Sequence, residues 1–298
     1  MATTIAEFFG YGPSDPSLAA VDARNHLRCP FLGETCVKTL SGGTISGVCT
    51  LKPATSGPVV CCPIRLYADD YRILRDVADA VFTPGLALRP GASAQAEARR
   101  TGTDCVAVFG KKWGGELRLP QRSGRGAYFV DWILARIDAT GVLTDFVAVE
   151  VQSIDTTGNY QAARHALLNG EPQLPSKAGF NWENVSKRIL PQIIYKGHVL
   201  RRERLCTKGL FFICPTPVYN RISDRLGGTL MAYGLQPGTL TFRWYDVSRG
   251  ATPGTAAPLV FEGQFTTTVD QVALAFTAPS NLPPSGVYEE AIAHALLG

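Results

Sequence analysis

Asp131, Glu150 and Gln152 are the residues of this 298-residue chain whose types and spacing best suit chemistry. Mg²⁺ takes few protein ligands and keeps several waters, so two carboxylates suffice to hold it. A divalent ion held in this way neutralises charge on a phosphate and produces hydroxide at neutral pH, as phosphodiester hydrolysis requires. Gln152 cannot take up a proton, so it can only position water, metal or phosphate. Activation of the attacking water then falls to the metal, to bulk water or to the phosphate itself.

The three residues are predicted to share one face of a β-hairpin. The dipeptide Ala139-Thr140 separates two apolar, β-branched runs and predicts a two-residue turn. This turn places Asp131 opposite Ala148, and side chains two positions apart on a strand point to the same face. The nearest Cβ atoms of the three residues then lie roughly 5 to 8 Å apart.

Plain sheet is the alternative interpretation of this hairpin. A three-residue turn would reverse the parity, and a Glu-x-Gln pattern also occurs in half-solvated antiparallel sheets that do no chemistry. Asp138 and Asp145 fall outside the cluster, at the turn and on the opposite face.

The surrounding elements follow from periodicity and from turn residues. Asp69 and Asp70 precede an i, i+3, i+4 apolar pattern and predict a helix start, and Pro84-Gly85 ends that helix. Pro191 should kink or restart a later helix. We expect helices over 69–82, 92–100, 182–195 and 288–297, strands over 104–109, 127–138, 142–154, 208–215 and 239–247, and short strands and loops over 250–285.

Five of the eight cysteines lie between positions 29 and 62. No Cys-x-x-Cys pair occurs, but four thiolates from widely spaced loops can close a tetrahedral structural metal site. Such a metal would order residues 1–68, whose Gly, Pro and Ser clusters predict irregular structure. The spacing leaves isolated buried cysteines as the alternative. Cys105, Cys206 and Cys214 stand in or beside apolar strands and are interpreted as core residues, and the four scattered histidines receive no catalytic role.

Composition fits a globular protein of one large or two modest domains, with 45% hydrophobic and 18% charged residues. No run of about 18 apolar residues occurs, and the first residues carry neither a basic nor an apolar leader pattern. We therefore expect a cytoplasmic protein. In that compartment thiolate metal sites are more common than disulfides.

Positive charge is concentrated in one segment rather than spread over the chain. The net charge is only +4, yet positions 181–225 hold nine basic residues against three acidic ones. Such an excess is expected where phosphates are neutralised. A solvated helix face is the alternative.

Several motifs in order resemble the NotI-like type II restriction endonuclease family, over roughly residues 26 to 220. The residues that carry this resemblance are Cys29-Pro30-Phe31, Cys36, Gly47-Val48-Cys49, Cys62-Pro63-Ile64-Arg65, Val130-Asp131, Phe146 to Gln152, Asp155 to Tyr160 and Asn181 to Arg188. The last quarter of the chain is not covered.

The resemblance implies an α/β (α+β) fold, with a mixed β-sheet PD-(D/E)xK core flanked by helices. It implies a small tetra-cysteine metal-binding region at 1–68 and a nuclease catalytic domain with DNA-binding elements at 69–298. Asp131 and Glu150 are then the metal ligands, and Gln152 stands in the usual lysine position. The four thiolates, which bind iron or alternatively zinc, are Cys29, Cys36, Cys49 and Cys62. Cys62 is preferred over Cys61 because the family's last cysteine precedes a proline.

The function implied is that of a type II restriction endonuclease of a restriction-modification system, a homodimer that cuts double-stranded DNA at a GC-rich palindrome with Mg²⁺. Candidate DNA contacts are Lys187, Arg188, Arg201, Arg202, Arg204, Lys111, Lys112, Arg122 and Arg125, and Arg or Lys suits guanine. Two alternatives are a non-catalytic DNA-binding module ordered by its tetra-cysteine site and a nonspecific repair or defence nuclease.

Overall fold

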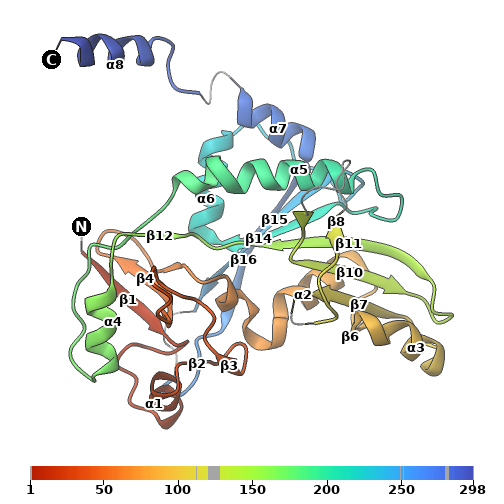
Figure 1. Ribbon diagram of the computed structural model, residues 1–298. Coiled ribbons are helices and arrows are strands. Elements are labelled where there is room, and N and C mark those ends of the chain that lie inside the picture. Colours follow the sequence, from red (N-terminus) through yellow and green to blue (C-terminus); the bar gives the residue numbers. More distant parts are fainter. Residues whose placement is uncertain are drawn as a thin grey trace.

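A computed structural model of the chain describes residues 2–111, 113–119, 128–248, 250, 252–278 and 282–297 (Figure 1). A mixed sheet of seven strands runs through its centre, in the order β16-β15-β14-β11-β10-β7-β6. Strands β11, β14 and β15 are parallel, as are β6 and β7, and the other neighbours are antiparallel. Their bounds are β6 Ala87–Pro90, β7 Cys105–Gly110, β10 Trp132–Ile137, β11 Leu143–Val151, β14 Leu210–Pro215, β15 Thr239–Val247 and β16 Leu259–Thr268.

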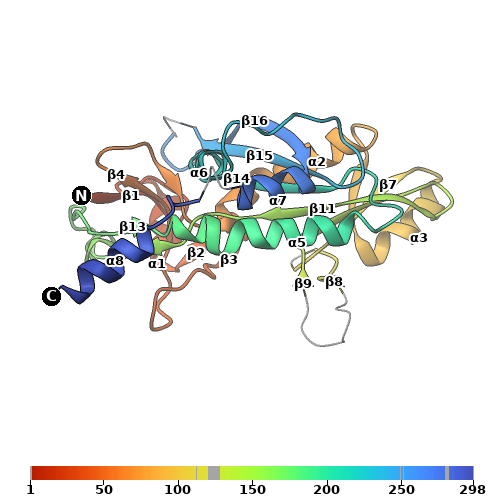
Figure 2. The same ribbon diagram turned by 90° about the horizontal axis from the view of Figure 1, so that it is seen from above.

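Helices cover both faces of this sheet, which confirms the predicted mixed α/β architecture. One face packs against α3, α5, α6 and α7, and the other packs against α2 (Figures 1 and 2). The alternation along β11 explains the two layers, because Val147 and Val149 face α2 while Ala148 faces the opposite core. The helices are α2 Ala68–Val81, α3 Gly91–Thr101, α5 Leu190–Leu200, α6 Thr216–Leu226 and α7 Val269–Thr277.

The N-terminal region contains a small antiparallel sheet of β1 (Thr3–Phe8), β4 (Val48–Pro53) and β5 (Val59–Val60). The prediction of irregular structure before residue 68 was therefore wrong, because these strands are short and are separated by Gly- and Pro-rich loops. The sheet shares a core with Tyr160, Ala163 and Leu167 at helix α4. The other elements of this unit are α1 Leu18–Asn25, β2 Arg28–Cys29, β3 Glu34–Thr35, the 3₁₀ turn η1 Pro63–Tyr67, β12 Thr156–Thr157, α4 Gln161–Leu168 and β13 Gly179–Phe180.

Two predicted helices, 92–100 and 288–297, are confirmed as α3 and as α8 (Val287–Leu296). Pro191 has the predicted effect, since the π-helical turn η2 (Val185–Ile189) gives way there to α5. The loops expected over 250–285 instead contain the long strand β16 and the helix α7. No helix in the described part of the chain is long and apolar enough to cross a membrane.

The start of α2 differs from its prediction. Asp69, Asp70 and Tyr71 have φ angles of 57°, 55° and 57°, so they form a left-handed turn and cannot cap a right-handed helix dipole. The turn brings the Tyr71 ring within 5.3 Å of Tyr67 and 5.4 Å of Trp132, measured between centroids. Packing of these rings accompanies a backbone conformation that the sequence pattern does not reveal.

One buried ion pair joins the N-terminal sheet to the central sheet. Arg65 of η1 is fully buried and donates to Glu7 of β1 at 2.9 and 3.0 Å. The same guanidinium donates to the carbonyl of Ala257, just before β16, and lies 4.7 Å from the Phe31 ring centroid. Three distant parts of the chain therefore meet at one side chain.

Replacing Glu7 with glutamine should destabilise the protein by about 3 to 5 kcal/mol, because the Arg65 charge would be left buried without its partner. Urea unfolding followed by circular dichroism measures this loss. The matched control is Asp70→Asn, which removes an exposed carboxylate paired with Arg75 and should cost about 0 to 1 kcal/mol. If the two substitutions lowered the free energy of unfolding equally, the buried Glu7–Arg65 pair would contribute no more to stability than an exposed pair.

Candidate functional site

The β10–β11 hairpin brings Asp131 and Glu150 together, although its turn is not the predicted one. The turn spans three residues, with the Asp138 N–H donating to the Val142 carbonyl at 2.9 Å and Gly141 at φ 82°. The Asp138 carboxylate stabilises this wider turn by accepting the N–H groups of Thr140 and Val142.

A second offset restores the parity that the wider turn alone would reverse. The register shifts by one residue between Arg136 and Ile137, so that Trp132 lies opposite Val149. Asp131, which immediately precedes β10, therefore lies beside Glu150 and not beside Ala148. Together the two offsets shift the strand pairing by two residues, and a shift by two leaves each side chain on its predicted face. Asp131 and Glu150 therefore share a face, as predicted.

Asp131, just before the start of β10, is held in place by a hydrogen bond to the backbone. Its Oδ2 atom accepts the N–H of Val151, the last residue of β11, at 2.8 Å. Burial raises the pKa of Asp131, while this hydrogen bond and the Lys196 ammonium oppose the rise. The side chain is therefore held in place with one oxygen committed to the protein.

Glu150 is a buried carboxylate in an apolar strand, with an exposed fraction of 2%. Burial raises its pKa to about 7, the Asp131 carboxylate adds to the rise, and the Lys196 ammonium opposes it. Its Oε1 atom accepts a hydrogen bond from Lys196 Nζ. Its Oε2 atom is also buried and has no hydrogen-bond partner among the described residues.

The unpaired Glu150 Oε2 atom indicates whether the site suits a divalent ion. A buried carboxylate oxygen without a donor is costly unless something positive completes it. Asp131 and Glu150 offer hard oxygen ligands of the kind that Mg²⁺ prefers. The chemistry of the two carboxylates and the unpaired Oε2 atom therefore fit a divalent cation at these two residues.

Besides Glu116, whose charge adds to the rise in the pKa of Asp131, the sequence analysis missed Lys196 in this cluster. It counted only toward the basic excess, yet its side chain is 7% exposed and reaches Glu150 from helix α5. The spacing of Lys196 along α5 could have revealed it, because it falls on the buried face of the helix. Ile193, Gly197 and Leu200 lie on the same face. A lysine in the apolar stripe of a helix indicates a buried partner.

Gln152 lies just past the end of β11, and its N–H still donates to the Ile213 carbonyl at 2.9 Å. Because it lies outside the strand, the alternation of side chains along β11 does not extend to it. It lines a hollow of about 500 Å³ together with Lys38, Asp155 and Arg188. Arg188 pairs with Asp155 at 3.1 Å, so a cation stands at the mouth of the hollow that Gln152 enters.

The four predicted thiol ligands line one small cavity. Cys29, Cys36, Cys49 and Cys62 surround it, while Cys61 does not. Burial raises the pKa of Cys62 to about 12, and the neighbouring Cys61 and Cys36 act in the same direction, whereas Lys38 opposes it. Among the described residues, no three His, Cys, Asp or Glu side chains already converge on a metal position.

Cys61 has a different environment, since Lys38 Nζ lies 3.3 Å from its sulfur and 2.8 Å from its carbonyl oxygen. Cys61 lines the neighbouring hollow of about 500 Å³ and not the cavity that the other four share. The remaining cysteines, Cys105, Cys206 and Cys214, are buried as predicted.

The predicted DNA contacts do not form one patch. Lys187 and Arg188 lie on η2, whereas Arg201, Arg202 and Arg204 follow the other end of α5, roughly 20 Å away at 1.5 Å per residue. The described members of the set are exposed. Arg201 pairs with Asp270 of α7. Lys112, Arg122 and Arg125 lie outside the described residues, and Lys111 is exposed.

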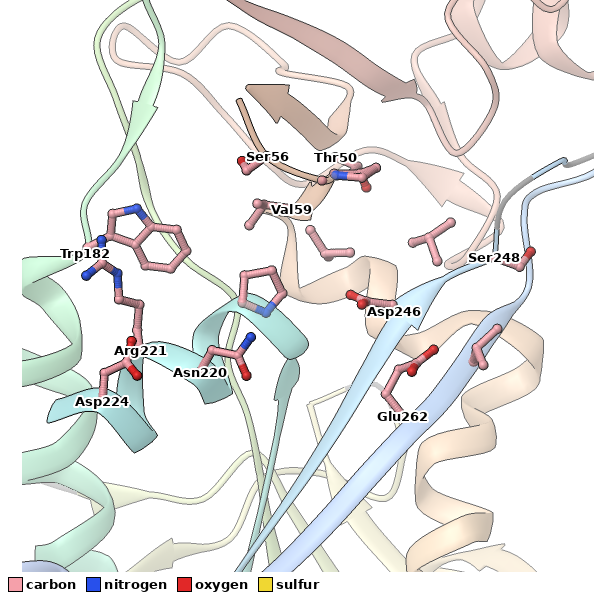
Figure 3. Close-up of a pocket in the computed structure, with 16 residues that line it drawn as sticks. Thr50, Ser56, Val59, Trp182, Asn220, Arg221, Asp224, Asp246, Ser248 and Glu262 are labelled. Carbon is pink, nitrogen blue, oxygen red and sulfur yellow. The ribbon is translucent and has the colours of Figure 1, made fainter. Parts of the chain in front are cut away.

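A larger hollow of about 800 Å³ lies away from this cluster (Figure 3). It is bounded by the loop before β5, by α6 and by the ends of β15 and β16. Arg221 lies against the Trp182 ring at 5.4 Å, but Asp224, Asp246 and Glu262 give the hollow an acidic lining. These three carboxylates are exposed or half-buried, whereas Glu150 is buried with one oxygen unpaired, so Asp131 and Glu150 remain the better candidate for a metal site.

Comparison with known proteins identifies the family of the chain. A family model described as restriction endonuclease NotI matches residues 17–208, which include the four thiols, both carboxylates, Gln152 and Lys196. No curated protein matches the chain. The chain therefore belongs to the NotI restriction endonuclease family, and it is a restriction endonuclease whose substrate is DNA.

Proposed function

We propose that this protein is a type II enzyme, which hydrolyses both strands of DNA at a fixed, GC-rich palindrome with Mg²⁺ held by Asp131 and Glu150. The observation that carries the proposal is the pairing of half-buried Asp131, just before β10, with buried Glu150 of β11, whose Oε2 is left unpaired. Bound Mg²⁺ would supply a Lewis acid for the scissile phosphate and a hydroxide at neutral pH.

The protein's own residues would fix the geometry of this reaction. Asp131 is oriented by the Val151 N–H, and Glu150 is oriented by Lys196. Gln152 cannot accept a proton and acts by hydrogen bonding to water or phosphate in the hollow it lines. Arg188 lines the same hollow as Gln152 and is proposed to contact phosphate there.

Recognition of a palindrome is matched by two-fold symmetry of the protein, so the active form is proposed to be a homodimer. Lys187 and Arg188 at one end of the η2–α5 helix, and Arg201, Arg202 and Arg204 at the other, are proposed to contact separate stretches of phosphate backbone.

The four thiols around the N-terminal cavity are proposed to hold a structural iron ion, with zinc as the alternative. Their softness suits either metal, and a closed site of four thiolates has no open position for chemistry. Binding would draw the thiols together and release their protons, and the metal–thiolate bonds would offset the cost of placing negative charge in this buried cavity. The role of the metal is then to order the region that carries Arg65 and Tyr67.

Incubation of the wild-type protein with plasmid DNA and Mg²⁺ should give discrete fragments with one shared end sequence. Asp131→Asn and Glu150→Gln should each lower the cleavage rate by about 1000-fold, because each removes a metal-ligand charge. DNA binding, followed by gel shift in Ca²⁺, should persist in both variants.

The control for these variants is Asp138→Asn, the same chemical change at the exposed turn of the same hairpin, where the amide oxygen can still accept the turn hydrogen bonds. It should cut at the wild-type rate. Near-normal cutting by Glu150→Gln would refute the site. Fragment ladders would indicate a nonspecific nuclease, and intact DNA with a gel shift would indicate a binding module.

Cys62→Ser should lower the bound metal and the yield of soluble protein, and Cys49→Ser should do the same, because each removes one of four ligands. Metal content is measured by inductively coupled plasma mass spectrometry on protein purified without chelators. The neighbouring Cys61→Ser is the matched control, since this thiol lies outside the cavity, and it should retain the metal. Wild-type protein free of iron and zinc would contradict the assignment of a metal to the four thiols.

A further inference from the structure

We propose that Lys196 is a positioning residue of the catalytic centre, which holds Glu150 by one carboxylate oxygen so that the other oxygen is presented to the divalent ion. The inference rests on the proposed function of Asp131 and Glu150. It adds a residue from helix α5, outside the hairpin.

The burial of the pair is the first reason. The Lys196 and Glu150 side chains are 7% and 3% exposed, and a lysine is rarely buried to this degree without a role for its charge. Lys208 and Asp145 form the comparable pair at the other end of β11, and there the lysine side chain is 30% exposed. The two pairs sit on the same strand, roughly 16 Å apart at 3.3 Å per residue, so only one of them lies at the carboxylate cluster.

The division of the carboxylate oxygens is the second reason. Lys196 Nζ bonds Oε1 of Glu150, and Oε2 is buried without a partner among the described residues. Among the described residues, this is the buried unpaired carboxylate oxygen, since the other buried side-chain atoms without a partner are guanidinium nitrogens and one hydroxyl. One oxygen fixed by an ammonium and one held open is the arrangement that a metal ligand needs.

The rigidity of α5 is the third reason. Gly197, next to Lys196, lies so close to α7 that an added Cβ would come within 2.6 Å of Val269. The helix is therefore packed directly against its neighbour, and Ile193 and Leu200 anchor it in the core on either side. The ammonium is delivered from a fixed element and not from a mobile loop.

The charge of Lys196 also acts on Asp131, since it opposes the rise in pKa of both carboxylates. Gln152, the third residue of the hairpin cluster, carries no charge. Among the described residues, Lys196 is the cation that forms an ion pair with a carboxylate of this cluster. It orients the ligand, and it also repels a divalent ion, so its removal should separate metal affinity from turnover.

Lys196→Met tests this separation. In slightly alkaline buffer, removal of the competing cation should tighten Ca²⁺ binding by about tenfold. Ca²⁺ binding is measured without DNA, from the rise of the thermal midpoint with Ca²⁺ concentration. Turnover of a DNA duplex in Mg²⁺ should fall by about 100-fold or more, while KM changes by less than about threefold. Lys196→Arg should recover part of the turnover, because the charge and the donor return.

The matched control is Lys208→Met, which removes the lysine of the Asp145 pair and should leave both the Ca²⁺ response and the turnover unchanged. If Lys196→Met does not fold, Lys196→Gln is measured in its place, with the same tighter Ca²⁺ binding and slower turnover expected. Folded variants that cut within about threefold of wild type, or that bind Ca²⁺ no more tightly, would overturn the proposal for Lys196. Failure of the proposed function has another signature, in which the wild type does not cut and Glu150→Gln does not alter the Ca²⁺ response.

Discussion

A carboxylate buried within an apolar strand is the constraint on which the rest of this structure depends. Glu150 stands between Val149 and Val151, which face the α2 layer, and its own side chain enters the opposite core. A charge in that position must be paired or coordinated, or it must be neutralised. Lys196 provides one partner from α5, and a divalent ion is proposed as the other. Many protein cores would tolerate apolar residues in place of this ion pair. Its presence near the end of a central strand therefore argues for a functional role and not for a contribution to stability.

The sheet topology explains how residues distant in the sequence reach this point. Strand β11 pairs with β10 in antiparallel fashion and with β14 in parallel fashion, so the start of β10 lies beside the end of β11. The end of a central parallel strand is also where open α/β sheets place their ligands. The N-terminal region reaches the same edge through η1, where Trp132 donates to the Tyr67 hydroxyl at 3.2 Å. Burial and the Asp131 carboxylate raise the pKa of Tyr67, so η1 lies within electrostatic range of the candidate site.

Sequence patterns predicted the long, regular elements well, because the spacing of their apolar residues reflects which side chains face the core. Strand β15 was predicted at its observed bounds, and the shared face of Asp131 and Glu150 was predicted correctly through a turn that was itself wrong. Patterns failed where structure depends on tertiary contacts. The N-terminal strands lie among Gly- and Pro-rich loops that obscure their alternation, and the left-handed turn at Asp69 is accompanied by aromatic packing that no local pattern reveals. Lys196 was missed because charge was counted along the chain and not compared with the apolar stripe of its helix.

The central claim is that Asp131 and Glu150 hold the catalytic metal. Its most direct test is crystallography of the protein with a DNA duplex and Mn²⁺, because Mn²⁺ has an anomalous signal and takes the same hard oxygen ligands as Mg²⁺. The account predicts an anomalous peak bonded to an Asp131 oxygen and to Glu150 Oε2, with Lys196 still on Oε1. A well-ordered complex with Mn²⁺ bound elsewhere, and with none at these carboxylates, would contradict it.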